Sequence, residues 1–579
     1  MEISQLYELA TIIVYLLLMV SVGFIFNRFN LNTDDYFRNG CRGTWWLVGM
    51  SLFMIGFTAW TFTGAAGAAF LSGWTIFFIY LGNAFGMLVC GLFIAPWYRQ
   101  LRIVTVPEVY YLRYGELTRQ FIAYLNFFSS ILFAGLTLYG LSIFISAIFG
   151  LNIQIVILVL GIVVVGYSMA GGSWAVMATD FLQGAILIPL TLLVGILSLH
   201  AVGGVGGLFA EIRAHDLTEE FRFLKTEIPA WAPYSIFWGF LIFFHNAMNI
   251  LNFNAAARFN AVKTGRDASK ACYFAAFLTL IGAVVWLIPP MTGRILFSAE
   301  ILAVDIAQPA EAAYAIVALN LLPAGLTGLM AVAIFSATMS NLDTGLNRNS
   351  AVLIKDIYPE LCRLLGVTPS ENQAKLVFAS RIVTFILGTL IVGMALYFSY
   401  FSQHGIFNTM LNLMVVLGAP LAPPALFGLF MRRVPRYSAI AAIVVGWIPA
   451  SMGVFSEFLF GAPWGYQARF VSVFGVSSVV FIGSSLFWHY SSPEYREKVK
   501  AFFKRRDTPI RFAEEVGIGT DYAQLKILGI YVIIISLGVF ALALIPTNGG
   551  ERLTTVGLGT AIVAIGALMS YIGFKNQDQ

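Results

Sequence analysis

Charged residues are scarce in this sequence, and their scarcity excludes most classes of protein. Only 11% of the 579 residues are charged, whereas an ordinary soluble domain has roughly 25%, and the mean hydropathy is +0.82. Soluble enzymes, nucleic-acid-binding proteins and secreted scaffolds are therefore excluded. The net charge of +5 does not indicate a nucleic-acid partner, because the basic residues gather on one predicted face of a membrane. The sequence predicts an integral membrane protein.

Cysteine is also rare, and its placement argues against disulfides and metal clusters. The four cysteines lie in predicted helices or on the predicted cytoplasmic side and show no metal-ligand spacing: Cys41, Cys90, Cys272 and Cys362. The first ten residues contain no basic residue, so we expect no cleavable signal peptide and a retained first helix.

Long apolar runs, by contrast, are abundant. Fifteen stretches approach the roughly 20 residues that an α-helix needs to cross about 30 Å of hydrocarbon, and such continuous runs exclude a β-barrel. The predicted spans are 6–27, 46–72, 75–98, 119–150, 152–171, 176–203, 233–262, 268–295, 319–347, 376–402, 406–430, 437–457, 467–488, 526–546 and 554–573. We therefore expect an all-α integral membrane protein with about fifteen transmembrane helices.

The basic residues test this set of spans. With the N-terminus outside, 28 of the 34 lysines and arginines fall in predicted cytoplasmic loops, which normally carry an excess of such residues. The six that fall outside are Arg213, Arg222, Lys225, Arg294, Arg469 and Arg552. This separation predicts a multi-pass protein of the plasma membrane with its N-terminus outside and its C-terminus inside.

Polar residues within two apolar spans are the first functional signal, because each is costly in hydrocarbon unless it faces a cavity, an ion or a partner. Span 46–72 places Gly56, Thr58, Thr61, Thr63 and Gly64 at mid-membrane depth, and span 233–262 contains His245, Asn246, Asn249, Asn252 and Asn254. The two spans lie five apart, as do corresponding interrupted helices of inverted-repeat transporters. Hydrogen bonds between packed helices are the alternative explanation.

Span 319–347 adds oxygen ligands. At 100° per residue, Ala337, Ser340, Asn341 and Thr344 share one edge of a helix, and Asp343 flanks Ser340. Hard cations prefer oxygen ligands, and carbonyls of an unwound helix complete such a shell. These residues predict a sodium site between spans 46–72 and 319–347. Asp343 as a proton carrier is the alternative.

Several motifs, in order along residues 35–435, resemble the sodium/solute symporter family, which includes the sodium/glucose and sodium/proline cotransporters. They are Asp35 to Arg42 before Trp45 to Ser51, Thr105 to Glu108, Gly171 to Asp180 followed by Gln183, Arg258 with Ala261 to Lys263, Asp356 to Tyr358, and Gly428 to Arg433. The glycine pair at 171 and 172, followed by Ala-Val and Thr-Asp, is the most diagnostic of them.

The resemblance implies a leucine-transporter-type fold with a 5+5 inverted-repeat core and peripheral helices. The implied organisation is an N-terminal helix and cytoplasmic loop (1–45), a first five-helix repeat (46–203), an extracellular loop (204–232), a second repeat (233–432), peripheral helices (433–489), a basic cytoplasmic segment (490–526) and C-terminal helices (527–579). The basic segment would lie beside anionic lipid headgroups; a role in setting topology is its plainer explanation.

The resemblance also implies two ion sites. The main sodium site would use the carbonyls of Met54, Phe57 and Ala337 with the side chains of Ser340 and Asn341. The family usually has Ser or Thr where Asn341 stands, although an amide oxygen also binds sodium. A second sodium or proton site maps to Asp180, Ser340, Asp343 and Thr344, where the family commonly has a small polar residue in place of Asp343. Capping of the start of span 176–203 is the alternative role for Asp180.

Positions that match solute contacts in sugar-transporting relatives define an expected substrate site. They are Thr58, Thr61, Tyr80, Asn83 and His245, with Trp60, Asn246 and Asn249 close by. Their hydroxyl, amide and aromatic groups suit a small, polar, uncharged solute. His245 could equally bond a neighbouring helix. The residue types differ from those of sugar transporters, so sugar specificity is not carried over.

The sequence as a whole favours a sodium-coupled symporter that imports a small polar organic solute, with a sugar or polyol slightly favoured, by alternating access. Sodium is the expected coupling ion, with no organic cofactor, no enzymatic activity and no nucleic-acid partner; membrane lipids are the other expected partners. Proton coupling on the same scaffold, import of an amino acid or monocarboxylate, and a solute sensor that does not transport are the alternatives. Pro420, Pro423 and Pro424 predict a bent helix that could serve as a gate, although ordinary packing would also explain them.

Overall fold

A computed structural model describes residues 41–103, 105–168, 173–251, 256–369, 373–401, 405–515, 517, 521–545 and 548–575, together with Thr11, Val14 and Ser21. Within these ranges the chain is helical and forms no β-strand. Its one isolated β-bridge joins Gly43 to Val262, and the Gly43 amide donates to the Ala261 carbonyl over 2.8 Å. The four cysteines are buried and free.

The helices that precede residue 252 are α3 (Trp45–Gly56), α4 (Ala59–Phe62), α5 (Gly64–Ser72), η3 (Gly73–Ile76), α6 (Phe77–Val89), η4 (Cys90–Ile94), α7 (Ala95–Leu101), α8 (Val106–Tyr114), α9 (Glu116–Phe149), α10 (Ile153–Ser168), α11 (Ser173–Ala201), α12 (Gly204–Ala214), α13 (Thr218–Phe221) and α14 (Ile236–Leu251).

The helices that follow are α15 (Ala256–Phe259), α16 (Gly265–Leu296), α17 (Ser298–Leu302), η6 (Pro309–Ala312), α18 (Ala313–Leu321), α19 (Leu326–Val352), η7 (Leu353–Ile357), α20 (Tyr358–Leu364), α21 (Gln373–Phe401), α22 (Gly405–Leu413), η8 (Met414–Gly418), α23 (Ala422–Phe430), α24 (Ser438–Val454), α25 (Ser456–Phe460), α26 (Tyr466–Gly483), η9 (Ser484–Tyr490), α27 (Pro493–Asp507), α28 (Phe512–Glu515), α29 (Asp521–Leu542) and α30 (Gly549–Lys575).

The described residues contain eight helices that are long and apolar enough to cross a membrane, one bent pair that could form a ninth span, and five shorter apolar helices. Each predicted span from residue 46 onward overlaps one of these helices. The all-helical membrane fold is thereby confirmed. The predicted span 6–27 lies outside the described residues, so the total of fifteen stays a prediction.

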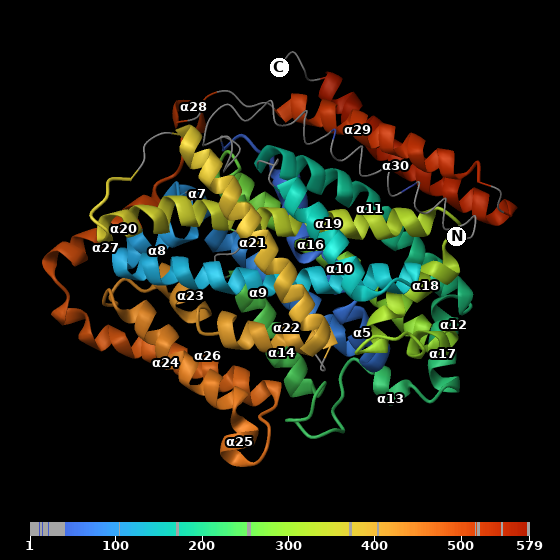
Figure 1. Cartoon of the computed structure of the whole chain (residues 1–579), viewed down its shortest axis with the longest axis horizontal. Coiled ribbons are helices and arrows are strands. Elements are labelled where there is room, and N and C mark those ends of the chain that lie inside the picture. Colours follow the sequence, from blue (N-terminus) through green and yellow to red (C-terminus); the bar gives the residue numbers. More distant parts are fainter. Residues whose placement is uncertain are drawn as a thin grey trace.

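The connecting helices gather at two opposite ends of the molecule (Figure 1). Helices α8, α20 and α27 lie at one end, and α12, α13 and α17 lie at the other. The first group belongs to segments predicted to be cytoplasmic, and the second to segments predicted to be outside. We call these the predicted inner end and the predicted outer end; their orientation in a membrane stays a prediction.

Within the described residues, two of the membrane spans are clearly interrupted. Helix α3 stops at Gly56, and Phe57 (φ −105°, ψ 75°) and Thr58 (φ −118°, ψ 178°) leave helical geometry before α4 begins. The pair α22–η8 and α23 bends by 48° at its break, where Pro420 stands and Pro423 and Pro424 follow. Both the predicted interruption of span 46–72 and the predicted bend are confirmed. For span 233–262, the residues between α14 and α15 lie outside the described ranges.

Helices α29 and α30 at the C-terminal end are each continuous, and the two lie along one edge of the molecule (Figure 1). The two helices approach closely at glycines: a Cβ on Gly529 would lie 2.6 Å from the Ser570 amide nitrogen, and one on Gly566 would lie 2.9 Å from the Gly529 carbonyl oxygen. Small residues of this kind are typical of helix packing in membranes.

Candidate functional site

A cavity of about 230 Å³ lies at the break between α3 and α4. The structure brings six of the eight predicted substrate residues to its wall: Thr58, Trp60, Tyr80, Asn83, Asn246 and Asn249. Phe57 and Asn341, two members of the predicted main sodium site, line the same cavity. Groups from spans 46–72, 75–98, 233–262 and 319–347 therefore converge at one cavity, in line with what the family resemblance implies.

One polar group of this wall, the indole of Trp60, is available to a ligand. The indole Nε1 of Trp60 is buried and has no hydrogen-bond partner within the part of the chain that the structure describes. A buried donor of this kind is costly unless a ligand or water accepts its proton. The Asn246 amide donates to the Ile242 carbonyl over 2.8 Å, which fixes its orientation. The wall thus contains one amide of fixed orientation, that of Asn246, and at least one unpaired hydrogen-bond donor, the Nε1 of Trp60.

Aromatic rings form the rest of the wall around the break. The Trp286 ring lies 4.3 Å from that of Phe57 and 5.4 Å from that of Tyr80, measured between centroids. Trp60 stacks on Phe407 of α22 at 6.0 Å. These contacts join the broken helix to α6, α16 and α22, so the shape of the cavity depends on all four elements.

Thr137, Thr279 and Trp286 are among the lining residues that the sequence analysis missed. Thr137 lies on α9 and Thr279 on α16, each as a hydroxyl within a long apolar helix. Their hydroxyls donate to carbonyls of their own helices, those of Phe133 and Ala275 respectively. Such a bond is the usual way in which a threonine is satisfied inside an apolar helix. A signal was present, but nothing in the sequence separates a cavity-lining threonine from one that bonds only its own helix.

The residues of the predicted main sodium site are brought to the same junction as far as they are described. The Met54 carbonyl, at the end of α3, accepts from the Phe57 amide over 3.2 Å. The Ala59 amide, at the start of α4, donates to the Thr338 hydroxyl of α19 over 3.0 Å, and Ala337 is buried beside it. The side chains of Ser340, Asp343 and Thr344 lie outside the described part of the structure, so the ligand set stays a prediction.

Asp180 occupies a buried ion pair. Its Oδ2 accepts a short hydrogen bond from the Ser51 hydroxyl of α3 and lies 3.3 Å from Nη2 of Arg258. Because α11 extends back at least to Ser173, Asp180 lies well inside the helix, and the capping interpretation is wrong. A sodium ion at the predicted second site would have to share this carboxylate with Arg258. The sequence marked Arg258 only as a motif residue and not as the partner of Asp180.

His245 and Thr61 are the two predicted substrate residues that do not line the cavity. The His245 ring stacks on Phe470 at 4.4 Å, and its Nδ1 lies 2.7 Å from the Tyr466 hydroxyl, both on α26. The Thr61 hydroxyl is buried and lies 3.5 Å from the Gly56 carbonyl oxygen. For His245 this geometry favours the alternative of a bond to a neighbouring helix.

A buried carboxylate fastens the predicted outer end of the bent helix. Oε1 of Glu311, on η6, accepts from the amides of Ile406 (2.6 Å) and Phe407 (3.3 Å) in the first turn of α22. Burial raises the pKa of Glu311 to about 7, although the two amide bonds act in the opposite direction. The η6 backbone also lies against α5, since a Cβ on Gly67 would come within 3.0 Å of Glu311. The sequence analysis missed Glu311.

Arginines fasten the predicted inner end of the same helix. Arg113 of α8 is buried and donates to the carbonyls of Gly428 (3.1 Å) and Met431 (2.8 Å) and to the Tyr495 hydroxyl (3.1 Å). Arg506 of α27 donates to the Leu429 carbonyl. Cations suit the C-terminal end of a helix because the carbonyls there have no partners within the helix.

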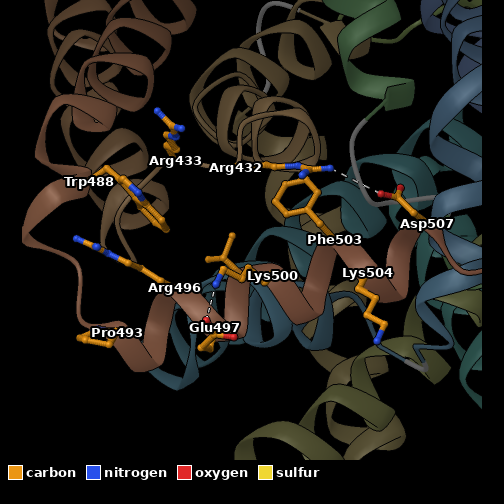
Figure 2. Close-up of a pocket in the computed structure, with 11 residues that line it drawn as sticks. Arg432, Arg433, Trp488, Pro493, Arg496, Glu497, Lys500, Phe503, Lys504 and Asp507 are labelled. Carbon is orange, nitrogen blue, oxygen red and sulfur yellow. Dashed lines mark hydrogen bonds and ion pairs between the residues drawn. The ribbon is translucent and has the colours of Figure 1, made fainter.

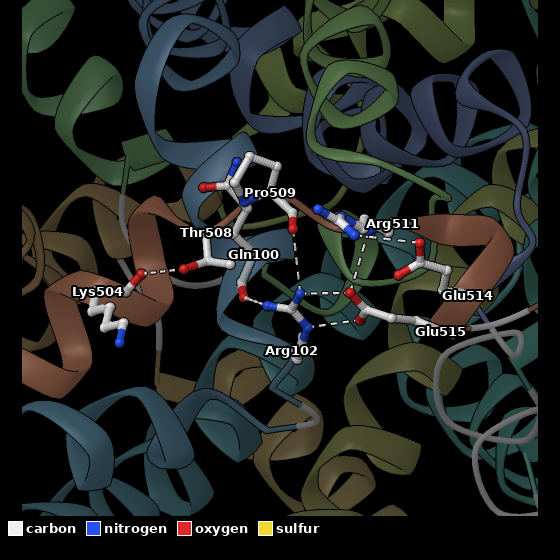
Figure 3. Close-up of polar contacts among 8 residues, drawn as sticks. All are labelled: Gln100, Arg102, Lys504, Thr508, Pro509, Arg511, Glu514 and Glu515. Carbon is white, nitrogen blue, oxygen red and sulfur yellow. Dashed lines mark hydrogen bonds and ion pairs between the residues drawn. The ribbon is translucent and has the colours of Figure 1, made fainter.

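A second, more exposed contact ties α28 to the loop after α7 (Figure 3). The Arg102 guanidinium donates to both carboxylate oxygens of Glu515, over 2.7 and 2.6 Å, and to the Gln100 carbonyl over 2.8 Å. The hydrogen bond from Arg102 lowers the pKa of Glu515. The segment 493–515 therefore links the inner ends of α7, α8 and α23, and we call this segment the strap.

Comparison with known proteins places the chain in a family. A model of the sodium:solute symporter family matches residues 36–446, well over half of the chain. The chain belongs to this family. Membership places it among sodium-coupled symporters of the membrane and confirms the resemblance that the motifs carry.

Two curated relatives of this symporter illustrate the range of the family. Sodium/glucose cotransporter 1 of Oryctolagus cuniculus is 25% identical over 504 residues, covering 79% of this chain and 73% of the relative. A high-affinity proline transporter of Bacillus subtilis is 26% identical over 479 residues, covering 79% of this chain and 95% of the relative. The solutes of the two relatives differ in chemistry, so family membership does not identify the solute of this symporter.

A solved structure supports the fold. The substrate-bound, outward-open state of a sodium-coupled sialic acid symporter superposes with a TM-score of 0.71 at 21% identity, covering 84% of this chain and 98% of that protein. At this identity the likeness shows a shared fold alone. The 5+5 arrangement of repeats and the division of the symporter into the predicted segments remain proposals.

Proposed function

We propose that this symporter imports a small, polar, uncharged organic solute together with sodium by alternating access. The observation that carries the proposal is the composition of the cavity wall at the helix break. It presents amides, hydroxyls and aromatic rings, and none of the described residues that line it is charged. A charged solute would lose its hydration there without gaining a counter-charge. The cavity volume of about 230 Å³ limits the solute to a small molecule.

Sodium would bind beside this cavity, where α3 ends and α19 passes. Carbonyls at the end of α3 are the oxygen ligands that a hard cation prefers, and Asn341 reaches the same cavity. Ion and solute would then share one junction, so that each stabilises the arrangement that the other needs. One positive charge that moves inward through 100 mV releases about 2.3 kcal/mol, which is enough to concentrate a neutral solute.

Alternating access would be supplied by the bent helix. Helix α22 carries Phe407 against Trp60 at the cavity, and its first turn is held at the predicted outer end by Glu311. Helix α23 is held at the predicted inner end by Arg113. Release of one attachment at a time, with the 48° bend as the flexible point, would open the cavity to one side only.

Proton coupling is the second candidate, because the chain has acids at 180 and 343. Asp180 is already paired with Arg258, which leaves less reason for it to take up a proton during transport. Import of an amino acid or a monocarboxylate is less favoured, since no described cation lines the cavity. A non-transporting sensor would bind solute in the same way and differ only in the absence of flux.

The sodium half of the proposal is tested by thermal unfolding of the purified protein in sodium, potassium and choline chloride at equal ionic strength. A ligand that binds only the folded state at 100 times its Kd stabilises that state by about 2.7 kcal/mol. We expect sodium alone to stabilise the protein and Ser340→Ala to abolish the effect. Ser336→Ala, one turn earlier on α19 and buried, is the matched control. Equal stabilisation of wild type and Ser340→Ala by sodium would contradict the site, and stabilisation by acid alone would favour proton coupling.

The solute half is tested in proteoliposomes with a panel of sugars, polyols, amino acids and monocarboxylates, each with and without a sodium gradient. We expect sodium-dependent uptake of a neutral polyhydroxylated member. Trp60→Phe removes the unpartnered Nε1 but keeps a ring, and should weaken uptake without changing the response to sodium. Trp74→Phe is the control, because its Nε1 is also buried and unpartnered in the described structure but lies outside the cavity. Solute binding without flux would identify a sensor.

A further inference from the structure

A second, larger cavity lies at the predicted inner end, far from the helix break. It has a volume of about 650 Å³ and lies between α27 and the loop that follows α23. Figure 2 shows Arg432 and Arg433 on one side of it and Arg496 and Lys500 of α27 on the other, with Trp488 and Phe503 between them. Lys504 lies at its rim. None of these residues belongs to the transport site.

The charges around this cavity are unbalanced. Five cationic side chains and two carboxylates line it, which leaves three net positive charges. Arg433 makes no hydrogen bond or ion pair with any described residue, and neither does the Lys504 ammonium. The cavity therefore holds positive charge that the protein itself does not neutralise.

The two carboxylates are already counted in this balance, and each of them is paired with a cation. Glu497 is bound by Lys500 at 2.6 Å. Asp507 is held by Arg506 at 2.7 Å, whereas Arg432 lies 4.0 Å from it. Arg432 instead rests on the Phe503 ring, with its guanidinium carbon 5.1 Å from the ring centroid. Its donors remain accessible, since 68% of the side chain is exposed.

The position of the cavity indicates the kind of anion. Helix α26 and η9 form one apolar span that runs to Tyr490, and the cavity begins at Trp488 within that last turn. Just beside it, Leu486, Phe487 and Tyr490 are exposed by 75%, 51% and 78%. Exposed apolar side chains face acyl chains in a membrane, and tryptophan is enriched at the level of the headgroups. The cavity therefore opens where a lipid phosphate would lie.

We propose that this cavity binds a phosphate-bearing anion, with Arg432 and Arg433 on one side and Arg496 and Lys500 on the other. Arginine forks bind phosphate oxygens in pairs, and lysine adds a point charge. The phosphate has two possible sources: the headgroup of an anionic phospholipid, or a soluble phosphate ester. A bound phosphate would join α27 to residues 431–433, directly after the helix end that Arg113 and Arg506 hold. Occupancy would thus strengthen the strap at the predicted inner end.

The test titrates the delipidated full-length protein, in an uncharged detergent, with four probes at equal ionic strength. Dioctanoyl phosphatidic acid supplies the phosphate on a lipid, glycerol 3-phosphate supplies it in water, and dioctanoyl phosphatidylcholine and sodium sulfate are the comparisons. Binding is followed by the change in unfolding temperature and by retention of the probe in native mass spectrometry. We expect saturable binding of at least one of the two phosphate monoesters in preference to sulfate.

The decisive variant is Arg433→Gln with Lys500→Gln, which removes one exposed cation from each side of the cavity. Its affinity for the phosphate probe should fall roughly tenfold or more, since each removed cation takes away a charge-assisted hydrogen bond to the phosphate. Arg436→Gln with Arg505→Gln is the matched control, because it removes two cations from the same loop and the same helix without touching the cavity wall. The control should bind as the wild type does.

Each outcome decides the proposal. Binding of phosphatidic acid alone identifies a lipid headgroup site, and binding of glycerol 3-phosphate with similar affinity identifies a site for soluble phosphate esters; both support the proposal. Equal losses in the two double variants would show that the surface attracts anions only through its overall charge, and would overturn it. Absence of saturable binding to either phosphate probe, or equal binding of sulfate, would also overturn it.

Discussion

The two ends of the bent helix α22–α23 are held by opposite charges and to different extents. At the predicted outer end one carboxylate, that of Glu311, accepts from two amides of the first turn. At the predicted inner end two guanidiniums, those of Arg113 and Arg506, donate to four carbonyls that follow the last turn or belong to it. Both arrangements satisfy groups that a helix end leaves unbonded, and both match the sign of the helix dipole.

The difference between the ends is chemical as well as numerical. The inner attachment uses planar guanidinium groups, which donate several hydrogen bonds each, whereas the outer attachment uses a single carboxyl group. Glu311 is buried and forms no ion pair within the described part of the chain, and its raised pKa of about 7 makes the outer attachment sensitive to pH near neutrality. We infer that the outer attachment is the weaker of the two and the one more readily released.

The largest effect is expected from Arg113→Met. The change removes four hydrogen bonds and leaves buried carbonyls of the α23 terminus without these partners. The free energy of unfolding should fall by about 4 kcal/mol, since bonds to charged groups contribute about 1.5 to 3 kcal/mol each and are only partly additive. Unfolding of the purified protein, followed by tryptophan fluorescence, measures it.

Two variants check the physical reason for that loss. Arg113→Lys keeps the charge but not the planar fork, and should recover only part of the stability. Arg363→Gln, on the exposed surface of α20 with 71% of its side chain accessible, should change stability by less than about 0.5 kcal/mol. Full recovery by lysine would show that charge alone holds the inner end.

The next largest effect is the pH dependence carried by Glu311. The carboxyl has a pKa of about 7 in the folded protein and 4.5 as its ordinary value, so the folded state binds this proton more tightly. Its stabilising contribution is complete below pH 4.5 and is lost as the pH rises through 7, by on the order of 3 kcal/mol. Wild type should therefore lose stability relative to Glu311→Gln between about pH 4 and pH 8.

Glu311→Gln is suited to this comparison because its amide oxygen can still accept from Ile406 and Phe407 while it no longer titrates. Glu300→Gln, on α17 at the same end, is the control, since the Glu300 carboxylate is exposed and accepts a hydrogen bond from the Asn320 amide. Parallel stability profiles for wild type and Glu311→Gln would show that the outer attachment does not titrate in this range.

A smaller effect should follow from Gly405→Ala at the start of α22. Gly405 has φ +73°, and a Cβ there would lie 2.6 Å from Oε1 of Glu311. Gly461 has nearly the same conformation, φ +74°, with nothing within 4 Å of an added Cβ. Gly461→Ala therefore measures the backbone cost alone, about 1 kcal/mol.

Gly405→Ala should cost about 1 kcal/mol more than that, because it also displaces the carboxylate. The excess should disappear in a Glu311→Ala background, which a double-mutant cycle on the same unfolding assay would show. An unchanged excess in that background would mean that the cost arises from Gln308, the other side chain near this Cβ, and not from the attachment.

The sequence could predict the helices of this symporter and the position of its break, because both depend on local patterns. Apolar length marks the spans, and Gly56 with Thr58 marks the place where α3 stops. It could also select Asn246 and Asn249 for the cavity wall. It could not exclude His245, because adjacent residues of a helix differ in direction by about 100° and only the position of α26 decides which of them faces the cavity.

The attachments at the two ends were beyond prediction for a different reason. Arg113 bonds backbone carbonyls 315 residues further along the chain at Gly428, and Glu311 bonds amides 95 residues away at Ile406. Any residue type at those positions supplies the same carbonyl or amide, so the partners have no sequence signal. Only a fold that brings the helix ends to these side chains reveals their role.

The smallest effect is expected from the exposed pair at the inner end. Arg102 and Glu515 have 26% and 33% of their side chains exposed, and such pairs contribute about 0 to 1 kcal/mol. Because Arg102 lowers the pKa of Glu515, the contribution is present above the ordinary carboxyl range and is lost as the pH falls through the lowered pKa. Arg102→Gln should therefore cost no more than about 1 kcal/mol at neutral pH and low salt, and almost nothing near 1 M salt, where screening acts over about 3 Å. If Arg102→Gln instead lowered the stability as much as Arg113→Met does, and if salt did not change that loss, the exposed contact between Arg102 and Glu515 would be the one that holds the inner end. The buried Arg113 guanidinium would then not be the main attachment.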